Sequence, residues 1–281
     1  MAFYLLKMTI LNLDELHRIA CVEGRDTYID PTSGYHVLTS QALLKQRRCC
    51  GNSCRHCPYG RFNVRGVDSP EVPMAKPVLI NWTQKQGGVD VLFWSGGKDS
   101  FLTLMHLLGE GKNVILLTSF GAHTNRVSIQ DVHIKDIAKQ AELFKVPLCL
   151  VPLFPNTDYK ESIEAALSMI CLQTELPILR LVFGDLHLKD IRQWREKTWG
   201  NYEIDTPLFN VPYAELLQRL WAFQARMGLS ITLATEVKLG NANLPVGTPY
   251  NQELVDHLEA SGIDGMLENG EGHTLVLSGS S

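Results

Sequence analysis

Short apolar runs alternate with amphipathic stretches along most of the chain after residue 77. Continuous apolar runs are typical of strands that helices cover on both faces, as in parallel sheets. The stretches between them place apolar residues at helical spacing. We expect strands at 89–94, 114–119, 148–153, 181–184 and 230–234, and helices at 100–108, 129–144, 159–170, 189–197 and 213–227. This alternation predicts an α/β fold with a Rossmann-like, doubly wound parallel sheet, whose ligands bind at the carboxyl ends of the strands.

The amino-terminal part follows a different pattern. We expect a helix at 11–23, a turn at 30–34, a strand at 35–39 and a short basic helix at 41–48 with Ser40 as its N-cap. Three prolines and no apolar period between 66 and 77 indicate a linker. The predicted organisation is a small cysteine-rich module at 1–65, a linker at 66–77 and a catalytic domain at 78–281.

Composition places the chain among ordinary globular proteins, with 45% hydrophobic and 20% charged residues in 281 positions. It contains no run of about 18 apolar residues and no signal-peptide pattern at its start, which predicts a soluble, cytoplasmic protein without a membrane partner. Seven cysteines, an odd number, argue against a secreted disulfide framework. The net charge is only −4, but residues 31–67 contain six Lys or Arg and no Asp or Glu. The cysteine-rich segment is therefore basic.

A glycine-containing loop, Ser95-Gly96-Gly97-Lys98-Asp99-Ser100, follows the first strand of the predicted sheet and leads into a helix. Two glycines let backbone amides approach an anion closely, and the helix directs its positive end to the same place. We therefore expect this loop to bind phosphate groups. Its spacing differs from the Walker A loop and from the dinucleotide-binding fingerprint. The alternative is a tight strand-to-helix turn with a serine cap.

This loop resembles the signature of the PP-loop ATP pyrophosphatases, also called adenine nucleotide α-hydrolases. Enzymes of that superfamily adenylate a substrate oxygen, release pyrophosphate, and let ammonia or sulfur displace AMP. The resemblance implies ATP and Mg²⁺ as cofactors. It also implies roles for the loop: pyrophosphate binding by Ser95, Gly96, Gly97 and Ser100, a positive charge from Lys98, and a Mg²⁺ ligand in Asp99.

Four further segments, 180–187, 190–196, 206–209 and 268–274, resemble the diphthine-ammonia ligase branch of this superfamily. That resemblance implies a ligase that activates a carbonyl or carboxylate and forms a C–N bond. Two features depart from the branch. Leu267 stands where relatives often carry glycine, and the amino-terminal cysteine module is absent from the standard ligase.

Several polar residues after the predicted strands are further candidates for the site. Asp185 closes a buried strand, where a carboxylate can bind Mg²⁺ or orient a nucleophile; its alternative role is to cap the next helix. Glu271 lies in the 268–274 stretch with Glu268 and His273, which either lines the pocket or forms a solvated turn. We expect catalytic roles for Lys98, Asp99, Asp185 and Glu271. Asn125 and Arg126 are expected to contact the nucleotide, and residues 120–123 to border the adenine.

The cysteines Cys49, Cys50, Cys54 and Cys57 fall within nine residues, which predicts a metal site. Four thiolates can close a tetrahedral zinc site, but the adjacent ligands Cys49 and Cys50 strain that geometry because neighbouring side chains diverge. Cys50, Cys54 and Cys57 alone can hold an iron-sulfur cluster with one open iron. Cys49 or His56 is then a candidate fourth ligand. Unliganded buried cysteines are the alternative, and we expect Cys21, Cys149 and Cys171 to be core residues of that kind.

Three functional hypotheses are consistent with these features, and we give them in order of preference. The first is an ATP-dependent adenylating ligase whose acceptor is a protein or tRNA. The second is an iron-sulfur-dependent tRNA sulfurtransferase, in which the basic segment attracts RNA. The third is a non-catalytic nucleotide-binding regulator with a zinc-stabilised arm.

Overall fold

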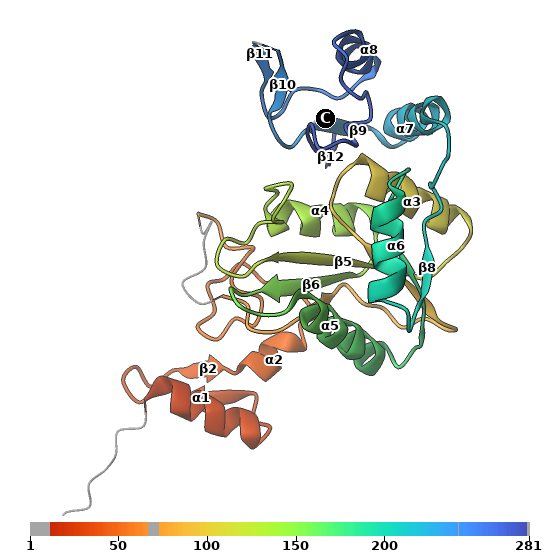
Figure 1. Ribbon diagram of the computed structural model, residues 1–281. Helices are drawn as coiled ribbons and strands as arrows, with labels where there is room; N and C mark the ends of the chain where they lie inside the picture. Colours follow the sequence, from red (N-terminus) through yellow and green to blue (C-terminus); the bar gives the residue numbers. More distant parts are fainter. Residues whose placement is uncertain (1–11, 67–72, 241, 280–281) are drawn as a thin grey trace, which may run out of the picture. The chain divides into compact units, whose positions relative to one another are not determined.

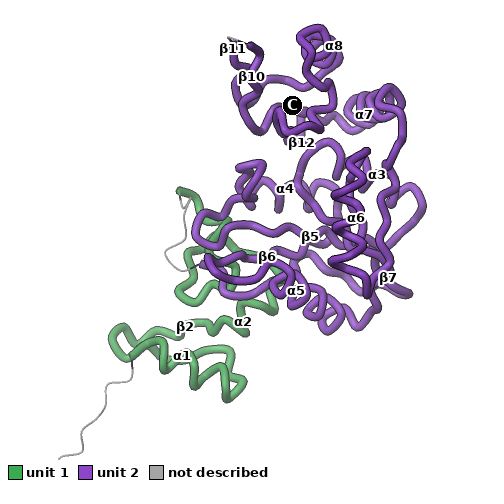
Figure 2. The backbone as a smooth tube through the Cα atoms, viewed as in Figure 1, with its two compact units in different colours: residues 1–67 green, residues 68–281 purple. Residues whose placement is uncertain are grey.

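The structure is a computed structural model that describes residues 12–66, 73–240 and 242–279. The chain divides into two compact units, Met1–Val67 and Asp68–Ser281 (Figure 2). Residues 1–11 of the predicted module and residues 67–72 of the predicted linker lie outside the described residues. In the described part, no helix is both long enough and apolar enough to cross a membrane.

Within residues 12–66, the first unit holds two helices and a hairpin: α1 (Leu13–Val22), β1 (Thr27–Ile29), β2 (His36–Leu38) and α2 (Ser40–Leu44). The strands β1 and β2 pair antiparallel. The Thr39 side chain accepts a hydrogen bond from the Ala42 amide, so Thr39 caps α2 and the prediction of Ser40 was wrong. The predicted continuation to Arg48 was also wrong, because Arg47 has a φ of 54°, which no right-handed helix contains.

The second unit is built on a six-stranded sheet, of which Figure 1 labels β5, β6 and β8. The strand order is β3-β6-β5-β4-β7-β8. Five neighbouring strands are parallel: β4 (Val89–Phe93), β5 (Val114–Gly121), β6 (Leu148–Leu153), β7 (Ile178–Val182) and β8 (Glu203–Asp205). The edge strand β3 (Val78–Ile80) joins β6 antiparallel. The chain winds outward from β4 in both directions, so the order reverses there. This confirms the predicted Rossmann-like α/β class and puts the switch point, where such sheets bind ligands, at the end of β4.

Four helices connect the strands: α3 (Lys98–Gly109), α4 (Ile134–Phe144), α5 (Tyr159–Thr174) and α6 (Lys189–Thr198). The central strands carry apolar side chains on both faces. On one face Val91, Ile115 and Leu117 pack with apolar residues of α5, while Leu92 and Leu116 are equally buried. Burial on both faces explains why these strands are continuously apolar. The predicted helix at 129–144 begins only at Ile134, because His133 caps it.

The carboxyl-terminal part contains α7 (Tyr213–Met227), β9 (Leu229–Leu233), β10 (Val237–Leu239), β11 (Ala242–Leu244), α8 (Gln252–Ala260) and β12 (Thr274–Ser278). We expected β9 in the parallel sheet, and this was wrong: it pairs antiparallel with β12 in a separate two-stranded sheet. The burial of β9 alternates along the strand, with Ser230 and Thr232 less buried than their neighbours. A strand covered on one face suits a small antiparallel sheet rather than a doubly covered parallel one.

Candidate functional site

The predicted phosphate loop connects the end of β4 to the start of α3, at the switch point of the sheet. Gly96 has a φ of +85°, a conformation that side chains rarely adopt. Gly97 caps α3, and a Cβ there would lie 3.1 Å from the Thr274 carbonyl oxygen. The second glycine is thus required because β12, from the end of the chain, packs directly on the loop.

Gln140 of α4 fixes the loop from its buried side. Its Oε1 accepts a hydrogen bond from Trp94 Nε1 at 2.8 Å, and its Nε2 donates to the carbonyl oxygens of Gly96 at 2.9 Å and Val276 at 2.6 Å. The Lys98 amide donates to Thr274 Oγ1 at 3.0 Å. The sequence analysis missed Gln140, for which a glutamine on the apolar face of α4 was the available signal; Thr274 belongs to the 268–274 segment, but its contact with the loop was not predicted.

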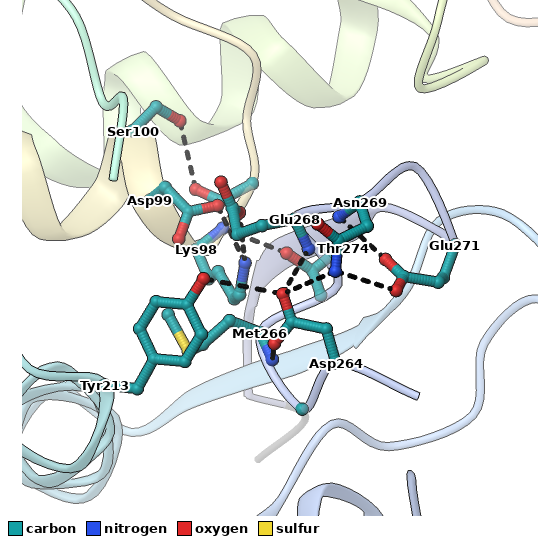
Figure 3. A network of polar contacts seen from close by, with 12 residues as sticks. Lys98, Asp99, Ser100, Tyr213, Asp264, Met266, Glu268, Asn269, Glu271 and Thr274 are labelled. Carbon is teal, nitrogen blue, oxygen red and sulfur yellow. Dashed lines mark hydrogen bonds and ion pairs between the residues drawn. The ribbon is translucent and has the colours of Figure 1, made fainter. Parts of the chain in front are cut away.

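Lys98 lies at the start of α3 in a buried ion cluster (Figure 3). Its Nζ is 2.8 Å from Asp99 Oδ2 and 3.3 Å from Glu268 Oε1, and only 3% of its side chain is exposed. Burial alone would lower the lysine pKa, but the nearby carboxylates of Asp99 and Glu268 outweigh burial and raise it. Lys98 is therefore a permanent cation beside the loop.

Glu268 has an unusual protonation equilibrium for a carboxyl group. Burial and the nearby Asp99 carboxylate raise its pKa to about 7, against the opposing effect of Lys98. A carboxyl group that titrates near neutrality can exchange a proton under working conditions. Glu268 belonged to a segment that we singled out, but the catalytic role was predicted for Glu271.

Glu271 instead binds the turn that contains it. Its two carboxylate oxygens accept hydrogen bonds from the Asn269 amide at 2.8 Å and from Asn269 Nδ2 at 3.3 Å (Figure 3). The structure brings Glu268, not Glu271, to Lys98. Asp264 supports the same segment, accepting hydrogen bonds from the Glu268 amide and from Tyr213 Oη.

Asp99 uses only one of its carboxylate oxygens on Lys98. The other, Oδ1, is buried and has no hydrogen-bond partner. A buried carboxylate oxygen without a partner is unusual, and hard cations such as Mg²⁺ prefer such ligands. Asp99 therefore fits the predicted Mg²⁺ role. Gly184, at the end of β7, packs on the same backbone: a Cβ there would lie 3.0 Å from the Asp99 carbonyl carbon.

A cavity of about 510 Å³ opens at the carboxyl ends of β4 to β7. Its lining includes Ser95, Asp99, Ser119, Tyr159 and Asp185, and the rings of Phe93 and Phe183, which stack at 4.4 Å. The volume suits a nucleotide-sized ligand. A second cavity of about 50 Å³ lies on the other side of Asp99, among Lys98, Glu268 and His273. Burial and Lys98 lower the pKa of His273.

Asp185 lies in the large cavity, but both of its oxygens are engaged. Arg195 Nε and Nη2 contact them at 2.6 and 2.8 Å, and the guanidinium group stacks 3.9 Å above the Phe183 ring. The helix-capping alternative was wrong, because Leu188 precedes α6 and no side chain caps it. Asp185 is thus a fixed anion of the cavity wall, paired with Arg195.

Asn125 and Arg126 lie beside the cavity rather than in its wall. The residues that line it in this loop are 127–130. Arg126 forms an ion pair with Asp131 at 3.3 Å. Asn125 is buried, with both polar side-chain atoms unpartnered. Of residues 120–123, none lines the cavity; Ser119 does.

The four clustered cysteines of the first unit form two pairs. Cys50 Sγ lies 3.4 Å from Cys54 Sγ, and Cys49 Sγ lies 3.9 Å from Cys57 Sγ. As they stand, no three His, Cys, Asp or Glu side chains among residues 12–66, 73–240 and 242–279 are grouped to hold a metal ion. Cys149 is buried as expected, but Cys21 and Cys171 are only half-buried, so their core assignment was wrong.

A comparison with protein-family models and a comparison with solved structures each found a match. Residues 16–63 match the model of a family of unknown function, DUF5522. A solved structure, the predicted subunit of a tRNA methyltransferase from Methanocaldococcus jannaschii, is similar at 18% identity over 69% of this chain and 98% of that chain, with a TM-score of 0.35. The family match covers the cysteine module alone, and the structural likeness is too low to carry an argument.

Proposed function

We propose that this chain is an ATP-dependent ligase of the PP-loop pyrophosphatase type. It converts ATP to AMP and pyrophosphate and uses the adenylated acceptor, a carbonyl or carboxylate, to form a C–N bond. The observation that carries this proposal is the pair Lys98–Asp99. A buried cation and a buried carboxylate oxygen without a partner meet at a helix amino terminus, at the switch point of the sheet.

Each part of the site has a role in this reaction. The start of α3 and the Lys98 ammonium attract the phosphates, and the Ser95 and Ser100 hydroxyls, 3.2 Å apart, are placed to orient them. Asp99 Oδ1 would hold Mg²⁺, which offsets the charge that develops on the leaving pyrophosphate. The aromatic wall of the large cavity suits the adenosine. Because Asp185 and Arg195 line the large cavity but not the small one that contains Lys98, we assign this pair to the acceptor.

Amide formation is preferred to sulfur transfer for a structural reason. Among the described residues that line the two cavities there is no cysteine. The clustered thiols lie in the other unit, and their two close pairs use all four sulfurs. Nothing in this arrangement singles out three ligands with an open iron, which the sulfurtransferase hypothesis requires.

The products of ATP cleavage test the proposal. The full-length protein is incubated with Mg²⁺, ammonium chloride and ATP labelled at the α- or γ-phosphate, with protein and RNA fractions supplied as separate acceptors. We expect AMP and pyrophosphate in equal amounts. Formation of ADP would contradict the proposal, and ATP that is bound but unchanged with every acceptor fraction would support the regulator. A Lys98→Met variant controls for contaminating ATPases.

A further inference from the structure

The two thiol pairs of the first unit have the spacing of corners in a metal-thiolate tetrahedron. A Zn–S bond of about 2.3 Å gives about 3.8 Å between two sulfurs on one zinc ion. The observed separations are 3.4 Å for Cys50–Cys54 and 3.9 Å for Cys49–Cys57. Each pair is therefore close to one edge of such a tetrahedron, although no third ligand from the described part of the chain is grouped with either pair as they stand.

The backbone around the cysteines is held by the segment that follows it. Arg61 Nε donates to the Cys54 carbonyl at 3.1 Å, and Asn63 Nδ2 donates to the Cys49 carbonyl at 3.3 Å. One cysteine from each pair is thus tied to the same short stretch, 61–63. Gly51, in the chain between Cys50 and Cys54, has a φ of +76°, and a Cβ there would lie 3.2 Å from the Asn63 carbonyl oxygen. These bonds hold both pairs in one loop.

The charge of this segment suits an anionic centre. Four thiolates on a divalent ion carry a net charge of −2, which needs positive neighbours. Residues 31–67 supply six Lys or Arg and no Asp or Glu. The whole first unit has nine Lys or Arg against five Asp or Glu, whereas the chain as a whole is negative.

His56 is engaged elsewhere and is a poor fourth ligand. Its Nε2 is 2.7 Å from Tyr28 Oη, and its ring stacks on His17 at 3.8 Å with an angle of 6° between the planes. Cys49, by contrast, already lies beside Cys57. The ligand set is therefore four cysteines rather than three cysteines and a histidine.

We propose that Cys49, Cys50, Cys54 and Cys57 together bind one Zn²⁺ ion, the two pairs closing onto the metal. The ion is a structural cross-link for the first unit. Sites of this kind rarely exist fully formed before the metal binds, and the binding free energy then stabilises the folded segment. The alternative that the same sulfur–sulfur distances permit is oxidation of each pair to a disulfide.

The metal content of the full-length protein, purified without oxygen, tests the proposal. We expect one zinc per chain, without sulfide. The single variants Cys50→Ser and Cys49→Ser each remove one cysteine, from a different pair. Each variant should lower the zinc content at least about tenfold, because one ion needs both pairs. Cys21→Ser and Cys171→Ser are matched controls that should keep it.

A second measurement remains informative if those variants fail to fold. Wild-type protein is stripped with a chelator and titrated with Co²⁺, whose thiolate bands report tetrahedral sulfur ligation. We expect saturation at one equivalent, with four thiols protected from a thiol reagent. Iron with sulfide, disulfides joining Cys50 to Cys54 or Cys49 to Cys57, zinc that depends on one pair alone, or free thiols without bound metal would each overturn the proposal.

Discussion

At the residue scale, Lys98 and its two carboxylates dominate the chemistry of the second unit. A buried ammonium group is tolerated only when counter-charges compensate for the water it has lost. Asp99 and Glu268 supply them from opposite ends of the unit's sequence. The two carboxyl groups differ, because Asp99 has a buried oxygen without a hydrogen-bond partner, whereas Glu268 has a pKa raised to about 7.

Asp99→Asn should lower the turnover of ATP to AMP about 100-fold or more, because it removes the carboxylate that would hold the Mg²⁺ acting on the leaving pyrophosphate. The melting temperature should fall by no more than a few degrees, since Glu268 remains beside Lys98 as a counter-charge. Asp136→Asn, which removes a surface partner of Lys139, is the matched control. Full activity of Asp99→Asn, or its unfolding, would contradict the assigned role.

Glu268 should make stability depend on pH in a defined window. Its folded pKa of about 7 lies above the ordinary value of 4.5, so the folded state binds more protons between these values. Stability contributed by the protonated form is then lost as the pH rises through 7. Thermal unfolding should therefore show Glu268→Gln gaining a few degrees on wild type between pH 5 and pH 8.

The control for this measurement is Glu142→Gln on the exposed side of α4. If the difference between wild type and Glu268→Gln stays constant from pH 5 to pH 8, Glu268 does not titrate in that window.

At the scale of elements, the site depends on how closely α3, β7 and β12 approach one another. Because Gly97 has no Cβ, β12 can pack against the loop. Because Gly184 has none, the end of β7 can pack against the start of α3. Gln140 then links the loop to β12 through three hydrogen bonds. The geometry around Lys98 is thus set by packing between elements that are distant in sequence.

Gly184→Ala should displace the start of α3, since the new Cβ would lie 3.0 to 3.1 Å from the backbone of Asp99 and Ser100. We expect a loss of about 1–2 kcal/mol in the free energy of unfolding and about tenfold in kcat/KM. Gly109→Ala, at the other end of α3, meets nothing within 4 Å and should be neutral or slightly stabilising. Equal behaviour of the two variants would show that the contact at Gly184 is unimportant.

At the scale of the whole molecule, the two units have different chemistry. The first unit carries the four clustered cysteines and an excess of positive charge, and the second carries the two cavities that Asp99 lines. Metal binding and nucleotide binding are therefore expected to be separable properties of one chain.

Cys54→Ser should accordingly leave the second unit intact. We expect loss of zinc and faster proteolysis between residues 40 and 65, because the cross-link is gone. The dissociation constant for ATP, measured by calorimetry, should change by less than about twofold, or roughly 0.4 kcal/mol. A tenfold weaker ATP affinity would show that nucleotide binding depends on the first unit.

The sequence alone determined the fold class and the position of the glycine-containing loop at 95–100. Both depend on local signals: continuous apolar strands of 4–8 residues, helices at regular spacing, and two glycines before a helix start. The predicted strand at 148–153 and helix at 213–227 agree with the structure to the residue. The cluster of four cysteines was also evident, since their spacing can be read from the sequence without knowledge of any tertiary contact.

Only the tertiary structure decided which distant residues complete the site. Glu268, Thr274 and Gln140 reach the loop from segments 40 to 180 residues away, and no local pattern ranks Glu268 above Glu271. The place of β9 was likewise undetermined, because its partner β12 is one of several short apolar segments. Long-range contacts depend on the packing of the complete unit, whereas periodicity and turn residues report only on the chain within a few residues of themselves.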